Sequence, residues 1–479
     1  MFIPDITSNL DFQTGAASDS YFINNGIDSL DDTTDVNIVL IHTHGGVSGS
    51  SCRLQFKDGS LLTASDVSNW LDQRDGGFFF AGACSSAKYT DLGYAFIYKG
   101  FDSYFGYRGT VNTMRNARFY AAFFEHASLA DVEVCDAADY AEDQVFLDFG
   151  YADDVGDNTN FTTLAIFYNF KRRKIVKFKQ ICILALILAS SIFVAFASEE
   201  GGLIFTKEDV KQTKHLDPST ADVNISFEDA KNKLILENPE VITESVHGEL
   251  IDNENFGIIW RVSSKTANGR SISAGIDASN GDLLFVYDGS KKVRGNNNIN
   301  KDDALTIAEK YIQSRVSADM INEIELEDVN YKESDADGLP GTYFISYARI
   351  IRGIPSLSDG VILRVNAETG EISSYNKRWS MSGEEIALID KEPSITDEEA
   401  IKILKEYMTS VPQIGEEKAN TVKVMSSNLV WKENEDDKIH LAWWIKFVDS
   451  SFAEDEDHPA SVWIDAHSGE ILLIAYGRD

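Results

Sequence analysis

The stretch IDASNGDL, residues 276–283, recurs in two related forms farther along the chain, VNAETGEI at 365–372 and IDAHSGEI at 464–471. The glycines of the three stretches stand 89 and 99 residues apart, a spacing typical of a small repeated domain. Each stretch ends one strand, turns through a glycine that can adopt positive φ, and begins a second strand. The sequence therefore predicts three β-hairpins in three repeats. One or two carboxylates per turn are too few for a calcium loop, so these acids are assigned to the turns themselves.

A helix and a further strand precede each hairpin. Apolar residues at helical spacing predict helices in ISFEDAKNKLIL, KDDALTIAEKYI and ITDEEAIKILKEYM. Ser226 with Asp229, and Thr396 with Glu399, have the spacing of capping boxes at two of the helix starts. Strands are expected in FGIIWRV (256–262), GTYFISYAR (341–349) and HLAWWIKFV (440–448). Each repeat is therefore predicted to be one helix packed against a small antiparallel sheet.

This order of elements resembles the PepSY domain, which is found in propeptides of thermolysin-like peptidases and in related cell-envelope proteins. The middle repeat, where ISYARIIRGIP (345–355) leads into DGVILRVNAETGEI (359–372), carries the resemblance most clearly. The resemblance implies three α+β PepSY-like units, at 220–290, 300–380 and 394–476. It also implies that this region binds or regulates another peptidase, as an inhibitor or a folding helper, rather than catalysing a reaction itself.

A basic block and an apolar run stand ahead of the repeats. KRRKIVKFKQ (171–180) is followed by ICILALILASSIFVAFA (181–197), a run without a charge. Its length suits both a cleaved export signal, with Ala195, Ala197 and Ser198 at the cleavage site, and a single-pass transmembrane helix. Because the basic block stays on the cytoplasmic side, residues after 198 are expected outside the cytoplasm and the N-terminal domain inside it.

The charge of the chain limits its partners. The formal net charge is −34 at pH 7, and residues 1–170 carry 24 acids against 8 bases while residues 199–479 carry 53 against 29. A phosphate backbone needs a basic face, so no nucleic acid is expected as a partner. The 4 cysteines are too few for a disulfide framework, so stability has to come from buried apolar side chains.

Two apolar runs in the N-terminal part end on reactive side chains. VNIVLIHTHGG (36–46) ends at His44 and Gly45, and FFFAGACSS (78–86) reaches Cys84. Continuous apolar runs are typical of buried parallel strands, whose carboxyl ends meet at one edge of an α/β sheet. A histidine and a cysteine that meet there could act as base and nucleophile, and the backbone N–H groups of Gly45 and Cys84 could hold the oxyanion.

A run ending in His-Gly, followed by a run ending in Ala-Cys, is similar to the signature of the caspase, gingipain, clostripain and legumain superfamily of cysteine peptidases. The resemblance implies a three-layer caspase-haemoglobinase α/β domain over residues 1–168, with a His44/Cys84 dyad, a peptide or protein substrate and no cofactor. The chain ahead of His44 is short for this fold, which favours a truncated domain. GACSS also differs from the QACRG pattern of caspases, so cleavage after Asp is not implied.

Other interpretations of these residues stay open. A cysteine at the end of an apolar strand is commonly a buried core thiol. His42 and His44 share a strand face, as in a zinc site, but no further ligand stands at short spacing, so no metal site is predicted. Farther on, His126 is expected to be a core histidine, and ADVEVCDAADYAEDQVFLDF (130–149) a helix that runs into a strand.

Two functional classes follow. In the first, a cysteine endopeptidase is joined through the membrane or export segment to a PepSY module. In the second, the N-terminal domain is degenerate, or belongs to a neighbouring gene that a fused reading frame has joined to this one. The protein is then an exported, non-enzymatic PepSY repeat protein. An export signal normally opens a gene, whereas about 170 residues precede this one, so the sequence supports both classes.

Overall fold

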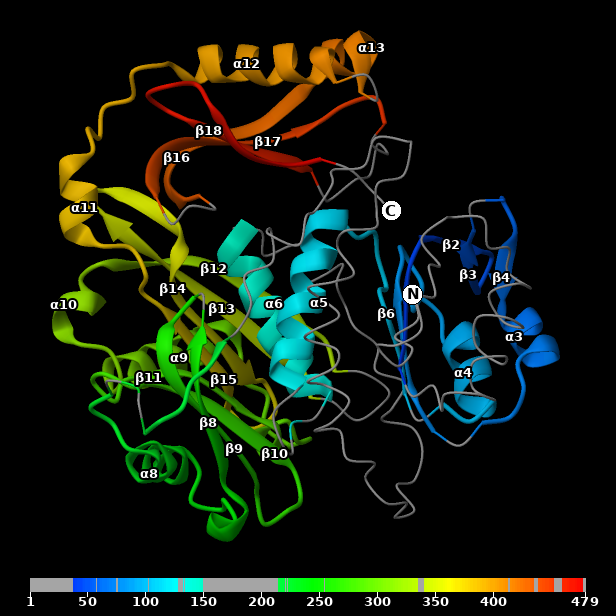
Figure 1. Cartoon of the computed structure of the whole chain (residues 1–479), viewed down its shortest axis with the longest axis vertical. Helices are drawn as coiled ribbons and strands as arrows, with labels where there is room; N and C mark the ends of the chain where they lie inside the picture. Colours follow the sequence, from blue (N-terminus) through cyan, green and yellow to red (C-terminus); the bar gives the residue numbers. More distant parts are fainter. Residues whose placement is uncertain are drawn as a thin grey trace. The chain divides into compact units, whose positions relative to one another are not determined.

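The computed structural model describes residues 38–149 and 214–476, apart from gaps at 57, 75, 102, 128–131, 133, 220, 222, 254, 335–339, 412–413, 435–437 and 452–458. The chain forms two compact units. Unit 1 contains Met1–Phe124, Asp153–Val210 and Gly477–Asp479, and unit 2 contains Glu125–Ala152 and Lys211–Tyr476. Figure 1 shows the elements of both units along the chain.

The described part of unit 1 contains a parallel and an antiparallel sheet of three strands each. The parallel sheet has the order β1-β5-β6 and is made of β1 (Ile38–His42), β5 (Phe78–Gly82) and β6 (Ser103–Gly106). The antiparallel sheet has the order β2-β3-β4 and is made of β2 (His44–Ser48), β3 (Ser51–Gln55) and β4 (Leu61–Thr63). The helices are α3 (Ala64–Trp70), α4 (Asp91–Tyr98) and α5 (Thr113–Ala127), the last of which ends in unit 2.

The parallel sheet of unit 1 is buried on both faces by aromatic rings. The Phe79 ring lies 4.0 Å from that of Phe96 in α4, measured between ring centroids, and on the other face Phe80 lies 4.5 Å from Phe105. Phe105 in turn stacks on Phe119 of α5. Burial on both faces explains why β1 and β5 read as continuous apolar runs, and the mixed α/β class expected for this part is confirmed.

Among its described residues, unit 2 contains a sheet of 13 strands built from three similar repeats. Repeat 1 comprises α8 (Phe227–Glu237), β8 (His247–Asn253), β9 (Gly257–Lys265), β10 (Ser271–Asp277) and β11 (Leu283–Asp288). Repeat 2 comprises α9 (Lys301–Gln313), β12 (Ile324–Lys332), β13 (Thr342–Ile351), β14 (Ile354–Asn366) and β15 (Ile372–Arg378). Repeat 3 comprises α12 (Asp397–Ser410), β16 (Lys423–Glu433), β17 (Ile439–Val448), β18 (Ala460–Asp465) and β19 (Ile471–Ala475).

Smaller elements complete unit 2, and the repeats join edge to edge. The smaller elements are β7 (Lys214–His215), η7 (Thr243–Ser245), η8 (Gly289–Lys291), α10 (Ala318–Ile321), α11 (Gly383–Leu388), α13 (Gly415–Asn420) and α6 (Val134–Phe149). Strand β11 of repeat 1 pairs antiparallel with β15 of repeat 2, and β14 pairs with β16 of repeat 3 at Ser356 and Trp431. The resulting strand order is β19-β18-β17-β16-β14-β15-β11-β10-β9-β8-β7, with β13 pairing β12 and β14.

The three predicted hairpins are present, and their turns use the same chemistry. Gly281, Gly370 and Gly469 have φ values of 79°, 79° and 76°, a left-handed conformation that glycine adopts at little cost. In each turn the first side chain accepts a hydrogen bond from the backbone two residues on, as when Asp277 Oδ1 accepts from the Ser279 N–H at 2.7 Å. The acidic residues thus serve the turns, as the sequence indicated.

Each repeat helix is anchored to its own hairpin. The N–H groups of Ile225, Ile299 and Ile395, just before α8, α9 and α12, donate to the carbonyl oxygens of Ala278, Ala367 and Ala466 at 3.0, 2.9 and 3.1 Å. The capping boxes predicted at Ser226 and Thr396 are formed. The repeats therefore share one local design, although their first strands β8, β12 and β16 were not predicted.

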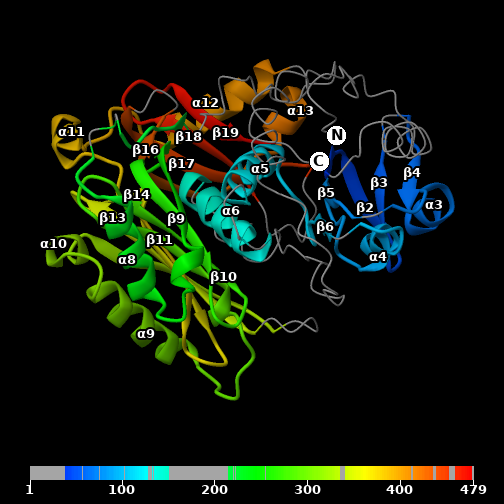
Figure 2. The ribbon, with the colours of Figure 1, turned by 60° about the horizontal axis from the view of Figure 1, so that its bottom comes forward.

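The two faces of the unit 2 sheet differ in chemistry. One face is apolar and packs on α8 and α9, through residues such as Val262, Ala274, Leu363 and Tyr375. The other face is polar and is covered by α6; Figure 2 shows α6 on one side of β11 and β14 and α8 and α9 on the other. Alternate residues of each strand supply the two faces.

Helix α6 corrects one expectation. The segment 130–149 was expected to pass from a helix into a strand, but α6 is helical from Val134 to Phe149. The apolar C-terminal end of α6 remains helical and packs on the sheet. Between ring centroids, Phe146 lies 5.4 Å from Phe344 in β13, and Phe149 lies 6.3 Å from Trp463 in β18. Helix α6 also groups with the C-terminal repeats in unit 2, although it precedes them by more than 60 residues in the sequence.

Candidate functional site

The predicted dyad segments meet in unit 1. Strands β1 and β5 are parallel neighbours, with His42 opposite Gly82, so the chain leaves both strands at the same edge of the sheet. A Cβ atom on Gly45 would lie 2.1 Å from the carbonyl oxygen of Cys84 and 2.9 Å from Cβ of Ala83. A side chain at position 45 would therefore collide with the cysteine backbone, which gives a steric reason for the glycine after His44.

The two reactive side chains of this segment differ in exposure. Cys84 is 7% exposed, and its Sγ accepts a hydrogen bond from the N–H of Val111 at 3.3 Å. His44 opens β2, opposite Gln55 of β3, and its side chain is exposed. The structure thus brings the backbone of Gly45 to that of Cys84, and the thiol is turned into a buried environment.

The turn after Cys84 is fixed by its hydrogen bonds. Ser85 has a φ of 55°, which is uncommon for a residue with a side chain and is a conformation that often occurs at functional sites. The Ser85 N–H donates to the Gly109 carbonyl at 2.8 Å, and the hydroxyl of Ser86 donates to the Ala81 carbonyl at 2.9 Å. The backbone that carries the cysteine is therefore held on both sides.

Two further predictions concern a metal and a membrane segment. Across the described parts of 38–149 and 214–476, no group of three or more His, Cys, Asp or Glu side chains could hold a metal ion. Within the same ranges, no helix combines the length and the apolar character needed to cross a membrane. The basic block, the run 181–197 and the cleavage candidates Ala195, Ala197 and Ser198 lie outside the described residues.

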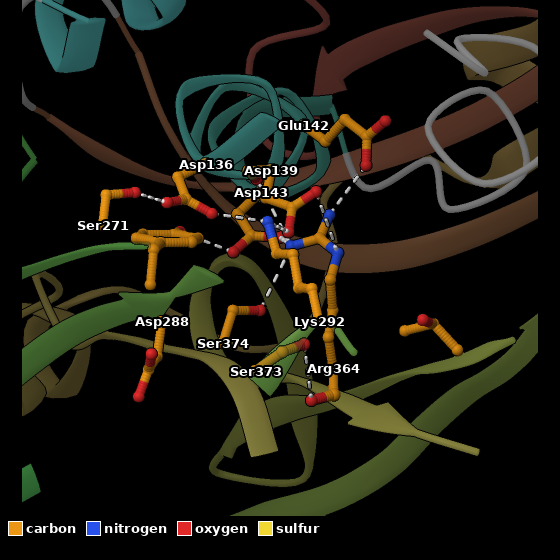
Figure 3. A network of polar contacts seen from close by, with 12 residues as sticks. Asp136, Asp139, Glu142, Asp143, Ser271, Asp288, Lys292, Arg364, Ser373 and Ser374 are labelled. Atoms are coloured by element: carbon orange, nitrogen blue, oxygen red, sulfur yellow. Dashed lines mark hydrogen bonds and ion pairs between the residues drawn. The ribbon is translucent and has the colours of Figure 1, made fainter. Parts of the chain in front are cut away.

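A second polar site, which the sequence did not reveal, lies on the polar face of the unit 2 sheet (Figure 3). Helix α6 carries five acids and no base. Its Glu142 and Asp143 contact the Arg364 guanidinium of β14 at 2.8 and 2.6 Å. Asp139 lies 3.9 Å from the same guanidinium and 2.8 Å from Nζ of Lys292. One arginine therefore serves three carboxylates.

Further pairs continue this network along α6. Lys292 Nζ contacts Asp136 at 2.7 Å, and Asp136 also accepts a hydrogen bond from Ser271 of β10. At the other end of the helix, Arg378 of β15 contacts Asp148 at 2.6 Å. Because these carboxylates belong to one helix and their cations to the sheet side, the network fixes the position of α6 along the sheet.

Burial decides the protonation of the carboxylates around Arg364. It raises the pKa of Glu142 to about 7 and that of Asp143 to about 6, although the Arg364 guanidinium acts in the opposite direction. For Asp139 the pKa is lowered, because Arg364 and Lys292 together outweigh the effect of burial. Three carboxylates beside one guanidinium repel one another, so a proton is retained more easily here than in water.

Residues 125–127, at the end of α5, join the same site. His126 is fully buried, its Nε2 lies 2.9 Å from the Ser273 hydroxyl, and its ring stacks on Tyr140 at 4.4 Å between centroids. Burial lowers its pKa well below the usual value, so the ring is neutral. Nearby, Arg261 donates to the Glu125 carbonyl at 2.8 Å. The expectation of a core histidine at position 126 is confirmed, although its core is that of unit 2.

One comparison with known proteins identifies a repeated domain in the C-terminal region. Residues 235–379 match the YcdB, YcdC repeated domain (DUF4901), and this range runs from within α8 to the end of β15. The C-terminal region therefore carries this repeated domain. A solved structure, the C-terminal domain of YpeB from Bacillus megaterium, covers 53% of this chain and 97% of that chain, with 13% identity and a TM-score of 0.31.

A relative of known sequence is an uncharacterized protein of Archaeoglobus fulgidus. It is 50% identical over 153 residues, which is 31% of this chain and 77% of the relative. At this identity, and with more than two thirds of the relative covered, the chain belongs to the same protein family as the A. fulgidus protein.

Proposed function

We propose that unit 2 is a non-enzymatic PepSY-like repeat module that binds another peptidase, as an inhibitor or folding helper. One observation carries the proposal. Three copies of a helix with four strands form a single sheet, and the first two copies lie largely within the match to the YcdB, YcdC repeated domain. A sheet of this kind offers extended edges and faces for binding another chain.

Strand β12 is the part of unit 2 that we propose as the contact for the peptidase. Within the described residues it pairs on one side only, with β13, so its other edge has unpaired backbone groups. Leu326 and Tyr331 on this strand are 47% and 51% exposed. Main-chain hydrogen bonds to such an edge provide affinity, and exposed apolar side chains provide anchors.

The test is a titration of a thermolysin-like metallopeptidase with the purified full chain. Peptide hydrolysis measures inhibition of the metallopeptidase, and light scattering measures complex formation. Inhibition or complex formation that is weakened by Leu326→Lys supports the proposal. A matched control is Leu388→Lys, because Leu388 is also an exposed leucine, 89% exposed, but belongs to α11 and not to β12. Neither inhibition nor complex formation with the unaltered chain would refute the proposal.

A second candidate function, cysteine endopeptidase activity, is supported by the close approach of Gly45 to the Cys84 backbone. In this candidate His44 is the base and Cys84 the nucleophile, and the thiol has to become accessible before it can attack a peptide. Incubating the full chain and its Cys84→Ala variant with a peptide library is the test. Cleavage that disappears in the variant supports this function, and equal inactivity of both chains rejects it.

We also propose that unit 2 lies outside the cytoplasm, because the basic block 171–180 precedes the apolar run 181–197. Helix α6 precedes this block in the sequence but packs on the unit 2 sheet, so a crossing at 181–197 would separate the helix from its partners unless residues 134–149 are carried across as well. Exposed positions Ser68 and Lys402 can be replaced by cysteine and labelled in intact cells with a membrane-impermeant maleimide, with the unaltered chain as background. Labelling of Lys402→Cys supports the proposed location of unit 2, and failure to label this variant in intact cells, with labelling after lysis, rejects it.

A further inference from the structure

The polar face of the unit 2 sheet has the composition of a surface, yet it is buried. Besides Phe285 and Phe344, it presents charged, hydroxyl and amide side chains on five neighbouring strands: Arg261, Ser271, Ser273, Tyr287, Arg364, Ser374, Asn376 and Arg378. An antiparallel sheet commonly packs one face on its core and presents the other to water. The apolar face, with α8 and α9, already provides that core.

The burial of the polar face comes from a segment outside the repeats. Residues 125–149 precede the first repeat by more than 60 positions in the sequence, and Asp136, Asp139, Glu142 and Asp143 of this segment contact this face through the network of Figure 3. Asp136, Asp139 and Asp143 are spaced by 3 and 4 residues, so they form one stripe along α6. That stripe faces Lys292 and Arg364.

The contacts of α6 have the features of an interface between two proteins. The charge pairs at its centre determine position and orientation, and large apolar side chains lie near its C-terminal end, where Phe146 packs on Phe344 and Phe149 on Trp463. At the start of the segment, Asn253 Nδ2 donates to Glu125 at 2.7 Å. Many polar groups of the sheet thus find partners on residues of this segment, while Asn376 also donates to the Tyr287 hydroxyl at 3.1 Å and Arg261 also pairs with Glu249 of β8.

We propose that the polar face is a binding surface for an acidic amphipathic helix, and that α6 is a tethered occupant which a helix of the same chemistry can replace. The fitting partner has carboxylates at positions i, i+3 and i+7, a further acid at i+6, and an aromatic residue at i+10, as in α6. This assignment does not depend on whether unit 2 binds a peptidase through β12.

The test separates α6 from its tether within the full chain. A recognition sequence for a specific protease is placed between residues 157 and 158, the purified chain is cut, and the fragments are followed by size-exclusion chromatography. A fluorescent peptide of residues 125–152 is then added, and its binding is measured by anisotropy. We expect the fragments to remain together after the cut and the peptide in excess to release the N-terminal fragment.

Peptide variants keep the test independent of the folding of unit 2. A peptide with Asp139→Asn, Glu142→Gln and Asp143→Asn should bind at least about 100-fold more weakly, because Arg364 would be left buried without a charged partner. A scrambled peptide of the same composition is the control and should not bind. Fragments that separate without peptide would overturn the proposal, as would fragments that stay together but never exchange, or equal affinity of the triple variant.

Discussion

The two faces of the unit 2 sheet are formed by the same strands but are stabilised by different interactions. Leu363 and Arg364 are neighbours on β14, and the first is fully buried against the helices of the apolar face while the second is 5% exposed beneath α6. On the apolar face the burial of apolar side chains stabilises the fold, and this effect does not depend on the orientation of individual groups. On the polar face each buried charge needs a particular partner. Burial there therefore makes the docking of α6 specific, and the loss of one partner destabilises it strongly.

The largest effect is expected from Arg364→Met. This substitution keeps the aliphatic stem but removes the charge that serves Asp139, Glu142 and Asp143. Breaking a buried pair from one side leaves uncompensated charges, so we expect unit 2 to lose about 3–5 kcal/mol of its free energy of unfolding. Urea denaturation measures this loss. Adding Glu142→Gln and Asp143→Asn should restore much of it, and a loss below about 1 kcal/mol would show that the network contributes little.

The matched change on the other face is Leu363→Ala. Deleting a fully buried leucine side chain costs about 2–5 kcal/mol through lost burial and the remaining cavity. Neutralising Glu142 and Asp143 should give no rescue here, because the cavity lies on the opposite face of the strand. A double-mutant cycle by urea denaturation checks this, and a coupling above about 1 kcal/mol would contradict the separation of the two faces.

A smaller loss of stability is expected from substitutions at the hairpin glycines, which lie in turns between strands and belong to neither face. Replacing Gly281 by Ala places a side chain in the left-handed region and should cost about 1–2 kcal/mol. Gly469→Ala should cost more, since its Cβ would lie 2.8 Å from Cδ1 of Ile403, against 3.2 Å to Ile225 at position 281. Gly383→Ala is the control, because nothing lies within 4 Å of its Cβ. Thermal unfolding of the three variants should show this order.

The difference between the faces also explains what the sequence could predict. The hairpins follow from local turn chemistry, in which an Asp or Asn and a glycine lie within five residues, so Asp277 and Gly281 suffice to indicate one. The close approach of Gly45 to Cys84 follows from two apolar runs that end at one sheet edge. The network at Arg364 joins residues more than 200 positions apart, and its arginine alternates with apolar residues as in any solvated strand face. No local pattern distinguishes such a face from one that another segment will cover.

The remaining prediction concerns pH, to which only the polar face should respond near neutrality. Burial raises the pKa of Glu142 to about 7 and of Asp143 to about 6, so docked α6 binds more protons than free α6 between about pH 4 and pH 7. Docking therefore weakens as pH rises through this window. The other titratable or charged groups near the two carboxyls are Asp139, Tyr287, Lys332 and Arg364.

Asp139, with its lowered pKa, acts in the opposite direction but only below its usual titration range, in more acidic solution. We expect the 125–152 peptide to bind at least about tenfold more weakly at pH 7.5 than at pH 5. A peptide with Glu142→Gln and Asp143→Asn should lose this pH dependence. The unaltered peptide should keep it when it binds a chain that carries Leu363→Ala. Anisotropy titrations across the range measure both, and stronger binding at pH 7.5 would mean that Arg364 outweighs burial and keeps all three carboxylates ionised.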